Sequence, residues 1–217
     1  MVLAVVNESK TMTLADAEKA VRACAFQVRS HVAPEWGMVP PEIVLCHSTA
    51  DAPAGADILT ILDDSDEGGF LGYHRVTPDG KPYARVFVNS IYIHGGEMLT
   101  TSLSVSTVMS HEICEWFVDR FLNLWAGGPN GQYALEICDP VAEDTYEIDG
   151  VSVSNFVYRR FFDHRAPQCC RLDHLGTVSA PFSVRPGGRI RVRRTGKVED
   201  IRGDMVMPEL DRAVNHG

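Results

Sequence analysis

The sequence predicts an α+β fold. Two segments, residues 13–34 and 102–121, carry apolar residues at helical spacing. Short apolar runs of strand length, bounded by turn residues, lie between these segments and after the second one. The chain has 217 residues, of which 45% are hydrophobic. It can therefore bury a core in one domain, or in two lobes that share a cleft.

The first predicted helix begins at Thr13, because Asp16 follows at the spacing typical of a helix start. We expect this helix to end at Pro34. Its apolar positions are Leu14, Ala17, Val21, Cys24, Ala25 and Val28. Apolar runs at 42–47 and 58–62 then predict two buried strands.

A hairpin is predicted next, because the runs 71–76 and 83–89 flank a Pro-Asp-Gly turn at 78–80. The central helix follows, beginning at Ser102 or Ser104. The residues available to pack it against a sheet are Val105, Val108, Met109, Trp116, Phe117 and Phe121.

The chain after the central helix is predicted to be rich in strands. A Gly-rich stretch at 127–131 ends the helical region, and an Asp-Gly turn separates the last two predicted strands. These strands are residues 134–138, 145–148 and 151–157. We divide the chain into an N-terminal lobe (1–126), a β-rich lobe (127–184), and a basic strand with a C-terminal arm (185–217).

Composition and charge exclude several classes of protein. The net charge of -9 and the pI near 5.3 argue against a nucleic-acid-binding protein. The N-terminus lacks the basic start and long apolar run of a signal peptide, and no apolar stretch is long enough to span a bilayer. We therefore expect a cytoplasmic protein without a membrane partner. The six cysteines form no C-x-x-C pair, which is typical of reduced, mostly buried thiols.

A basic strand and an irregular tail end the chain. Arg189, Arg191 and Arg193 alternate with apolar residues, so they would project from one face of a strand. A solvated strand face is favoured over a phosphate-binding one, because no aromatic residues are interleaved. Residues 203–217 show little periodicity and are predicted to be an arm that orders on a partner.

The central helix carries the pattern H-E-x-x-E at residues 111–115. In the related pattern H-E-x-x-H, two imidazoles one helical turn apart hold zinc, and the Glu acts as general base on a metal-bound water. His111 and Glu115 keep that spacing, and Glu112 keeps the position of the base. Zinc accepts carboxylate oxygen at about the same distance as histidine nitrogen, so the substitution preserves a possible site. Cys114 could share the face of His111, but a small core residue is the favoured interpretation.

A third ligand must come from another segment. Asp119 lies about 12 Å along the helix from His111. It could therefore at most contact a metal ligand, and it could not bind the metal itself. The candidates are Glu136 and Asp139, which follow the Gly-rich break. Glu136 is slightly favoured for its distance from His111 along the chain. Asp139 precedes a proline and would suit either a ligand or a carboxylate that orients the imidazole.

These motifs resemble uncharacterised zincin-like proteins of the H-E-x-x-E type, including phage-encoded members. The resemblance covers about the central third of the chain. It is carried by the 111–115 pattern with Asp119, Asn123 and Trp125, by Glu136-Ile137-x-Asp139, and by residues 149–156. It implies a zincin fold, with a mixed sheet packed on helices, a central motif helix and a smaller β-rich lobe. It also implies His111 and Glu115 as ligands of a zinc cofactor and Glu112 as the catalytic base.

The function expected from the sequence is a zinc-dependent metallopeptidase, or an inactive relative, acting on a peptide or protein substrate. Tyr146, Tyr158 or His164 is the candidate donor to the oxyanion. The strand at 83–89 is the candidate edge strand for binding extended substrate. The alternative is a phage virion structural or assembly protein with a degraded or purely structural metal site. Such a protein would reside in the host cytoplasm or the virion, and its arm would dock on a second copy or on other virion proteins.

Overall fold

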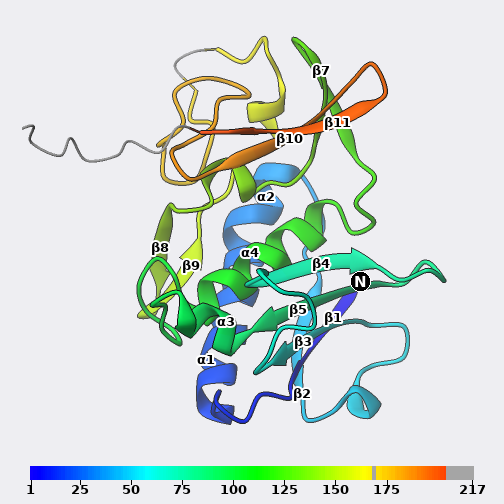
Figure 1. The fold of residues 1–217 in the computed structure, drawn as a ribbon, viewed down its shortest axis with the longest axis vertical. Coiled ribbons are helices and arrows are strands. Elements are labelled where there is room, and N and C mark those ends of the chain that lie inside the picture. Colours follow the sequence, from blue (N-terminus) through cyan, green and yellow to red (C-terminus); the bar gives the residue numbers. More distant parts are fainter. Residues whose placement is uncertain (168–169, 204–217) are drawn as a thin grey trace, which may run out of the picture.

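A five-stranded mixed sheet forms the N-terminal part of the structure, a computed structural model that describes residues 1–167 and 170–203 (Figure 1). Its strand order is β2-β1-β3-β5-β4. The first four of these strands run parallel, and β4 runs antiparallel to β5 at the edge. The strands are β1 (Val2–Asn7), β2 (Glu42–Cys46), β3 (Asp57–Leu62), β4 (Gly72–Val76) and β5 (Pro82–Phe87). The expected α+β class is confirmed.

Strand β1 was not predicted, although it lies in the middle of the sheet. Its residues Leu3, Ala4, Val5 and Val6 are fully buried. A strand covered on both faces shows a continuous apolar run without alternation. That run at the N-terminus was the available signal for it.

Two helices pack side by side on the sheet and against each other. Helix α1 (Leu14–Gln27) contacts β1 and β2, whereas α4 (Val105–Val118) contacts β4 and β5. Thr13 caps α1 by accepting a hydrogen bond from the backbone N–H of Asp16, and Ser104 caps α4 by accepting one from Thr107. The predicted start at Thr13 is confirmed, and of the two starts considered for the central helix the structure has Ser104. A short helix, α3 (Val88–Ile93), precedes α4.

Both predicted helix ends need correction. Pro34 does not stop the first helix, because a π-helical turn (Val28–Val32) leads into α2 (Ala33–Trp36), whose first turn tolerates a residue without N–H. Helix α4 ends at Val118 and not at Phe121. The Asp119 carboxylate accepts hydrogen bonds from the backbone of the following residues, and the Phe121 side chain is exposed.

The hairpin predicted at 71–89 is confirmed as β4 and β5, but its second strand ends at Phe87. Strand β5 lies between β3 and β4 and is therefore not an edge of the sheet. This corrects the assignment of residues 83–89 as the edge strand. Within the described residues, β4 pairs with β5 alone, so β4 is the free edge beside α4.

The rest of the chain forms a four-stranded antiparallel sheet and a separate hairpin. Figure 1 shows the two larger sheets at opposite ends of the molecule with α4 between them. The sheet has the order β11-β10-β7-β6, and β8 pairs with β9. These strands are β6 (Trp125–Gly128), β7 (Gly131–Ala134), β8 (Thr145–Ile148), β9 (Val151–Ser154), β10 (Arg189–Arg194) and β11 (Lys197–Arg202), and 3₁₀ turns occur at Thr49–Asp51, Asp139–Val141 and Arg159–Phe162.

The alternation predicted for the basic strand is confirmed, because Ile190 and Val192 of β10 are buried. The strand predicted at 134–138 is wrong beyond Ala134, since the backbone there turns toward α4. Of the predicted arm at 203–217, only Gly203 lies within the described residues. Among those residues, none of the helices is long and apolar enough to cross a membrane.

Candidate metal centre

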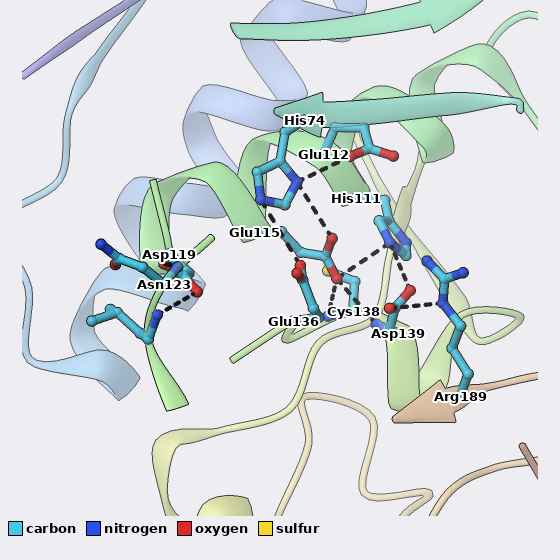
Figure 2. Close-up of polar contacts among 11 residues, drawn as sticks. His74, His111, Glu112, Glu115, Asp119, Asn123, Glu136, Cys138, Asp139 and Arg189 are labelled. Carbon is cyan, nitrogen blue, oxygen red and sulfur yellow. Dashed lines mark hydrogen bonds and ion pairs between the residues drawn. The ribbon is translucent and has the colours of Figure 1, made fainter. Parts of the chain in front are cut away.

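Helix α4 carries three of the candidate site residues into a buried cluster. Because residues four apart share a helix face, His111 and Glu115 point the same way. Glu115 and Glu112 are each less than 10% exposed, whereas the His111 side chain is 17% exposed. Figure 2 shows these side chains facing His74 on one side and the segment 136–139 on the other.

The first group in the cluster surrounds His111. Its Nε2 lies 3.3 Å from Glu115 Oε1 and 3.4 Å from Asp139 Oδ1. Glu115 Oε1 also accepts hydrogen bonds of 3.2 Å from the backbone N–H groups of Cys138 and Asp139. The Nε of Arg189 donates to Asp139 Oδ2 at 2.9 Å. The backbone turn and Arg189 therefore hold both carboxylates in place around the imidazole.

The second group surrounds His74, a residue of the predicted hairpin for which no role in the site was expected. His74 Nδ1 lies 3.3 Å from Glu112 Oε2 and 3.7 Å from Glu115 Oε2. Its Nε2 lies 3.9 Å from Glu136 Oε2. Glu115 thus turns one oxygen toward each histidine. Two groups of side chains could hold a metal ion, and both contain Glu115. One consists of His74, Glu112 and Glu115, and the other of His111, Glu115 and Asp139.

Strand β4 brings His74 to the cluster because a glycine lets it approach the helix. A Cβ at Gly72 would lie 2.6 Å from Val108 Cγ1 and 3.4 Å from Glu112 Cγ. His74 pairs across the sheet with Ala84, which is buried against the core. A lone polar side chain on this inward strand face was the signal that could have identified His74.

The carboxylates stabilise positive charge at both imidazoles. Burial alone disfavours the charged form of His74, but the hydrogen bond with Glu112 and the nearby carboxylate charges outweigh it and raise its pKa to about 9. Burial opposes the charged form of His111 too, yet the charge of Glu115 and the contact with Asp139 hold its pKa well above the ordinary value. Conversely, the charge of His111 overcomes burial and lowers the pKa of Glu115 to about 2.

A cavity of about 390 Å³ gives access to the cluster. Four consecutive residues of β4, positions 72–75, line one side, and Arg189 and Arg191 of β10 line another. A larger hollow of about 790 Å³ lies at the tips of the β6–β7 and β10–β11 hairpins, but no group of metal-binding side chains lines it within the described residues. Two further hollows, of about 570 and 580 Å³, are likewise lined by none of the described metal-binding groups, so the 390 Å³ cavity is the functional candidate.

The structure separates the two candidates for the third ligand. Asp139 lies beside His111, whereas Glu136, the slightly favoured residue, lies beside His74. Asp119 ends α4 and bonds to the backbone of Asn123 and Leu124, outside both groups. Cys114 contacts Gln27 and belongs to neither group.

The candidate oxyanion donors do not reach this cavity. The Tyr146 hydroxyl lies 2.9 Å from His31 Nδ1, and the Tyr158 hydroxyl lies 3.4 Å from His174 Nδ1. Neither tyrosine lines the cavity, and His164 does not line it either. These three assignments are therefore corrected. Among the arginines that line it are Arg189 and Arg191, which were predicted only as part of a solvated basic face.

Comparisons with protein-family models, with curated proteins and with solved structures found no match to this chain. The His, Glu and Asp groups around Glu115 can hold a metal ion on the basis of their own geometry.

Proposed function

We propose that this protein is a zincin-like, metal-dependent peptidase whose metal is zinc, held by His111, Glu115 and Asp139. The observation that carries the proposal is the convergence of His111 Nε2, Glu115 Oε1 and Asp139 Oδ1 at a cavity. The residue next to His111 on the same helix, Glu112, reaches the same cavity.

The spacing of these atoms fits a shared cation. Two ligand atoms that each lie about 2.1 Å from a tetrahedral zinc are separated by about 3.4 Å. The separations of 3.3 and 3.4 Å from His111 Nε2 match this value. Both carboxylates also face the same ring nitrogen. A carboxylate that only oriented the ring would bond to the other nitrogen.

Three protein ligands leave an open position, as in catalytic zinc sites. A cation bound there would polarise the carbonyl of the substrate and lower the pKa of a water molecule. The two anionic ligands, Glu115 and Asp139, offset part of its charge and so moderate this effect. Arg189 donates a hydrogen bond to Asp139 and so withdraws negative charge from that ligand. The polarising effect of the cation would thereby be partly restored.

Glu112 is the proposed general base. Its Oε2 faces His74, and Figure 2 shows its other oxygen pointing away from that ring. The free oxygen accepts a proton from the attacking water and passes it to the leaving amine. Arg189 and Arg191 of β10 line the same cavity, where they pair with Asp139 and Asp200.

Strand β4 is the proposed binding edge for the substrate backbone. Its residues 72–75 line the cavity, and its outer side is free of strand partners in the described part of the chain. An extended peptide can add to such an edge as a further strand. This role replaces the one predicted for residues 83–89.

The proposal is tested by removing and restoring the metal. Protein stripped with a chelator is expected to lose cleavage of a fluorogenic peptide library and to regain it with Zn²⁺ but not with Mg²⁺, because Mg²⁺ binds imidazole poorly. Cleavage that resists chelation would contradict the metal-dependent mechanism. Zinc-loaded protein that cleaves no member of the library would contradict the peptidase function.

The alternative function, a virion structural or assembly protein, was inferred mainly from the arm at 203–217. Apart from Gly203, that arm lies outside the described residues. The alternative therefore stays a prediction from the sequence.

A further inference from the structure

We propose that the cluster binds a second divalent cation, held by His74 Nδ1, Glu112 Oε2 and Glu115 Oε2. Glu115 would then bridge two cations, one beside each histidine. The second position adjoins the centre proposed above through Glu115, but it does not depend on peptide hydrolysis.

The separations around His74 have the lengths expected for ligands of one ion. Glu112 Oε2 and Glu115 Oε2 lie 3.3 and 3.7 Å from His74 Nδ1, and each of the three residues offers a ligand atom within 4.8 Å of those of the other two. These values bracket the separation of about 3.4 Å between ligand atoms of a tetrahedral zinc. The carboxylate of Glu115 is oriented for bridging, because the backbone N–H groups of Cys138 and Asp139 fix Oε1 on the His111 side.

Two unpartnered atoms provide an independent indication. Among the described residues, His74 Nε2 and Glu136 Oε2 are buried without a hydrogen-bond partner, although they face each other at 3.9 Å. The His74 side chain is only 3% exposed. When Nδ1 of a histidine binds a metal, Nε2 carries the proton and usually donates it to a carboxylate that orients the ring. Glu136 occupies that position. A cation on Nδ1 would therefore make His74 Nε2 the donor and Glu136 Oε2 the acceptor of an orienting contact.

The balance of charge favours the same conclusion. Glu112, Glu115 and Glu136 are buried, and within the described residues none of them has a Lys or Arg nitrogen within 4.0 Å. Arg189 forms its ion pair with Asp139 instead. Buried carboxylates are normally paired or bound to metal, because an isolated charge is costly in a low dielectric. Without a metal, the imidazoles of His74 and His111 are the cationic partners of these carboxylates, and a second dication would replace the charge of His74 as the partner of Glu112 and Glu115.

The donor atoms indicate the class of metal. One imidazole nitrogen with carboxylate oxygens suits Zn²⁺ or Mn²⁺, and no thiolate belongs to the group. Pairs of such ions bridged by a carboxylate clamp the attacking and leaving atoms in hydrolytic centres. With Oε2 on the second cation, Glu112 retains its other oxygen for proton transfer.

The test counts bound metal. Chelator-stripped protein is dialysed against Zn²⁺ and its zinc content per chain is measured. We expect two equivalents for the wild type and one each for His74→Ala and His111→Ala. His94→Ala is the matched control, because His94 is an exposed histidine outside the cluster, and it should keep two equivalents. His74→Gln replaces His74→Ala if the latter does not fold.

A second readout reports whether the two ions are neighbours. Mn²⁺-loaded wild type should give the electron paramagnetic resonance spectrum of a spin-coupled pair, and each single histidine variant should give that of isolated Mn²⁺. A wild type with one equivalent, or His74→Ala with undiminished zinc, would overturn the second site. If His111→Ala loses one equivalent of zinc and His74→Ala loses none, the centre at His111 is retained and the second site is rejected. Two equivalents without any peptide cleavage would retain the dinuclear site and reject the peptidase.

Discussion

Glu112→Gln is expected to lower kcat for peptide cleavage by about 10²–10⁴-fold, the usual contribution of a general base. Glutamine has nearly the same shape as glutamate but cannot accept the proton of the attacking water. The KM should change little, because the substrate contacts proposed for β4 are made by its backbone. Zinc should remain at the His111 centre, since Glu112 is not among its three proposed ligands.

The matched control is Glu147→Gln, at an exposed glutamate of β8 that does not line the cavity. This variant should cleave peptides at the rate of the wild type. Both variants are assayed after zinc loading, with the metal content of each sample measured in parallel. A Glu112→Gln protein that keeps more than a tenth of the wild-type kcat would exclude Glu112 as the base.

Asp139→Ala is expected to weaken zinc binding at the His111 centre by about 100-fold or more, because it removes one of three protein ligands. Loss of a residue that merely supports a ligand typically costs about 10–100-fold. The measurement is made in a His74→Ala background, so that only the His111 centre is titrated. In the same background, Glu136→Ala should change the affinity by less than about threefold, since Glu136 lies beside His74 and not beside His111.

This pair of variants decides between the two carboxylates that the sequence left open. The opposite order of effects, with Glu136→Ala the more damaging, would make Glu136 the third ligand and leave Asp139 as a partner of Arg189 alone. Equal and small effects would show that neither carboxylate completes the centre.

The helix part of the site was predictable from the sequence because its geometry is local. His111, Glu112 and Glu115 are fixed relative to one another by the helical repeat, and Ser104 supplies a recognisable cap. The candidacy of both Glu136 and Asp139 was predictable from their carboxylates and from the Gly-rich break before them. Which of them faces His111 depends on the turn at Cys138 and Asp139, whose N–H groups bind Glu115. Spacing along the chain contains no information about that contact.

His74 and the edge strand were missed for a different reason. The hairpin was predicted correctly, but a hairpin does not reveal which of its two strands pairs with the rest of the sheet. Strand β5 joins β3 in parallel, and this leaves β4 outermost and beside α4. That order depends on the crossover through the long loop after β3. Once the strand order is known, Gly72 and His74 can be recognised as site residues, because they lie on the inward face of β4 and contact α4.

The same limit applied to the aromatic candidates. Tyr146 and Tyr158 were candidate oxyanion donors. Their hydroxyls face His31 and His174, remote in sequence from each other. Contacts between such distant segments are set by tertiary packing and leave no periodic signal.

Whether His111, Glu115 and Asp139 hold zinc is measured by zinc K-edge X-ray absorption on zinc-loaded His74→Ala protein, which isolates the His111 centre. We expect a first shell of nitrogen and oxygen only, at about 2.0–2.2 Å, with one imidazole, and loss of the bound zinc when His111→Ala is added. Sulfur at about 2.3 Å, the distance of a zinc–thiolate bond, or zinc retained after both histidines are removed, would contradict this expectation.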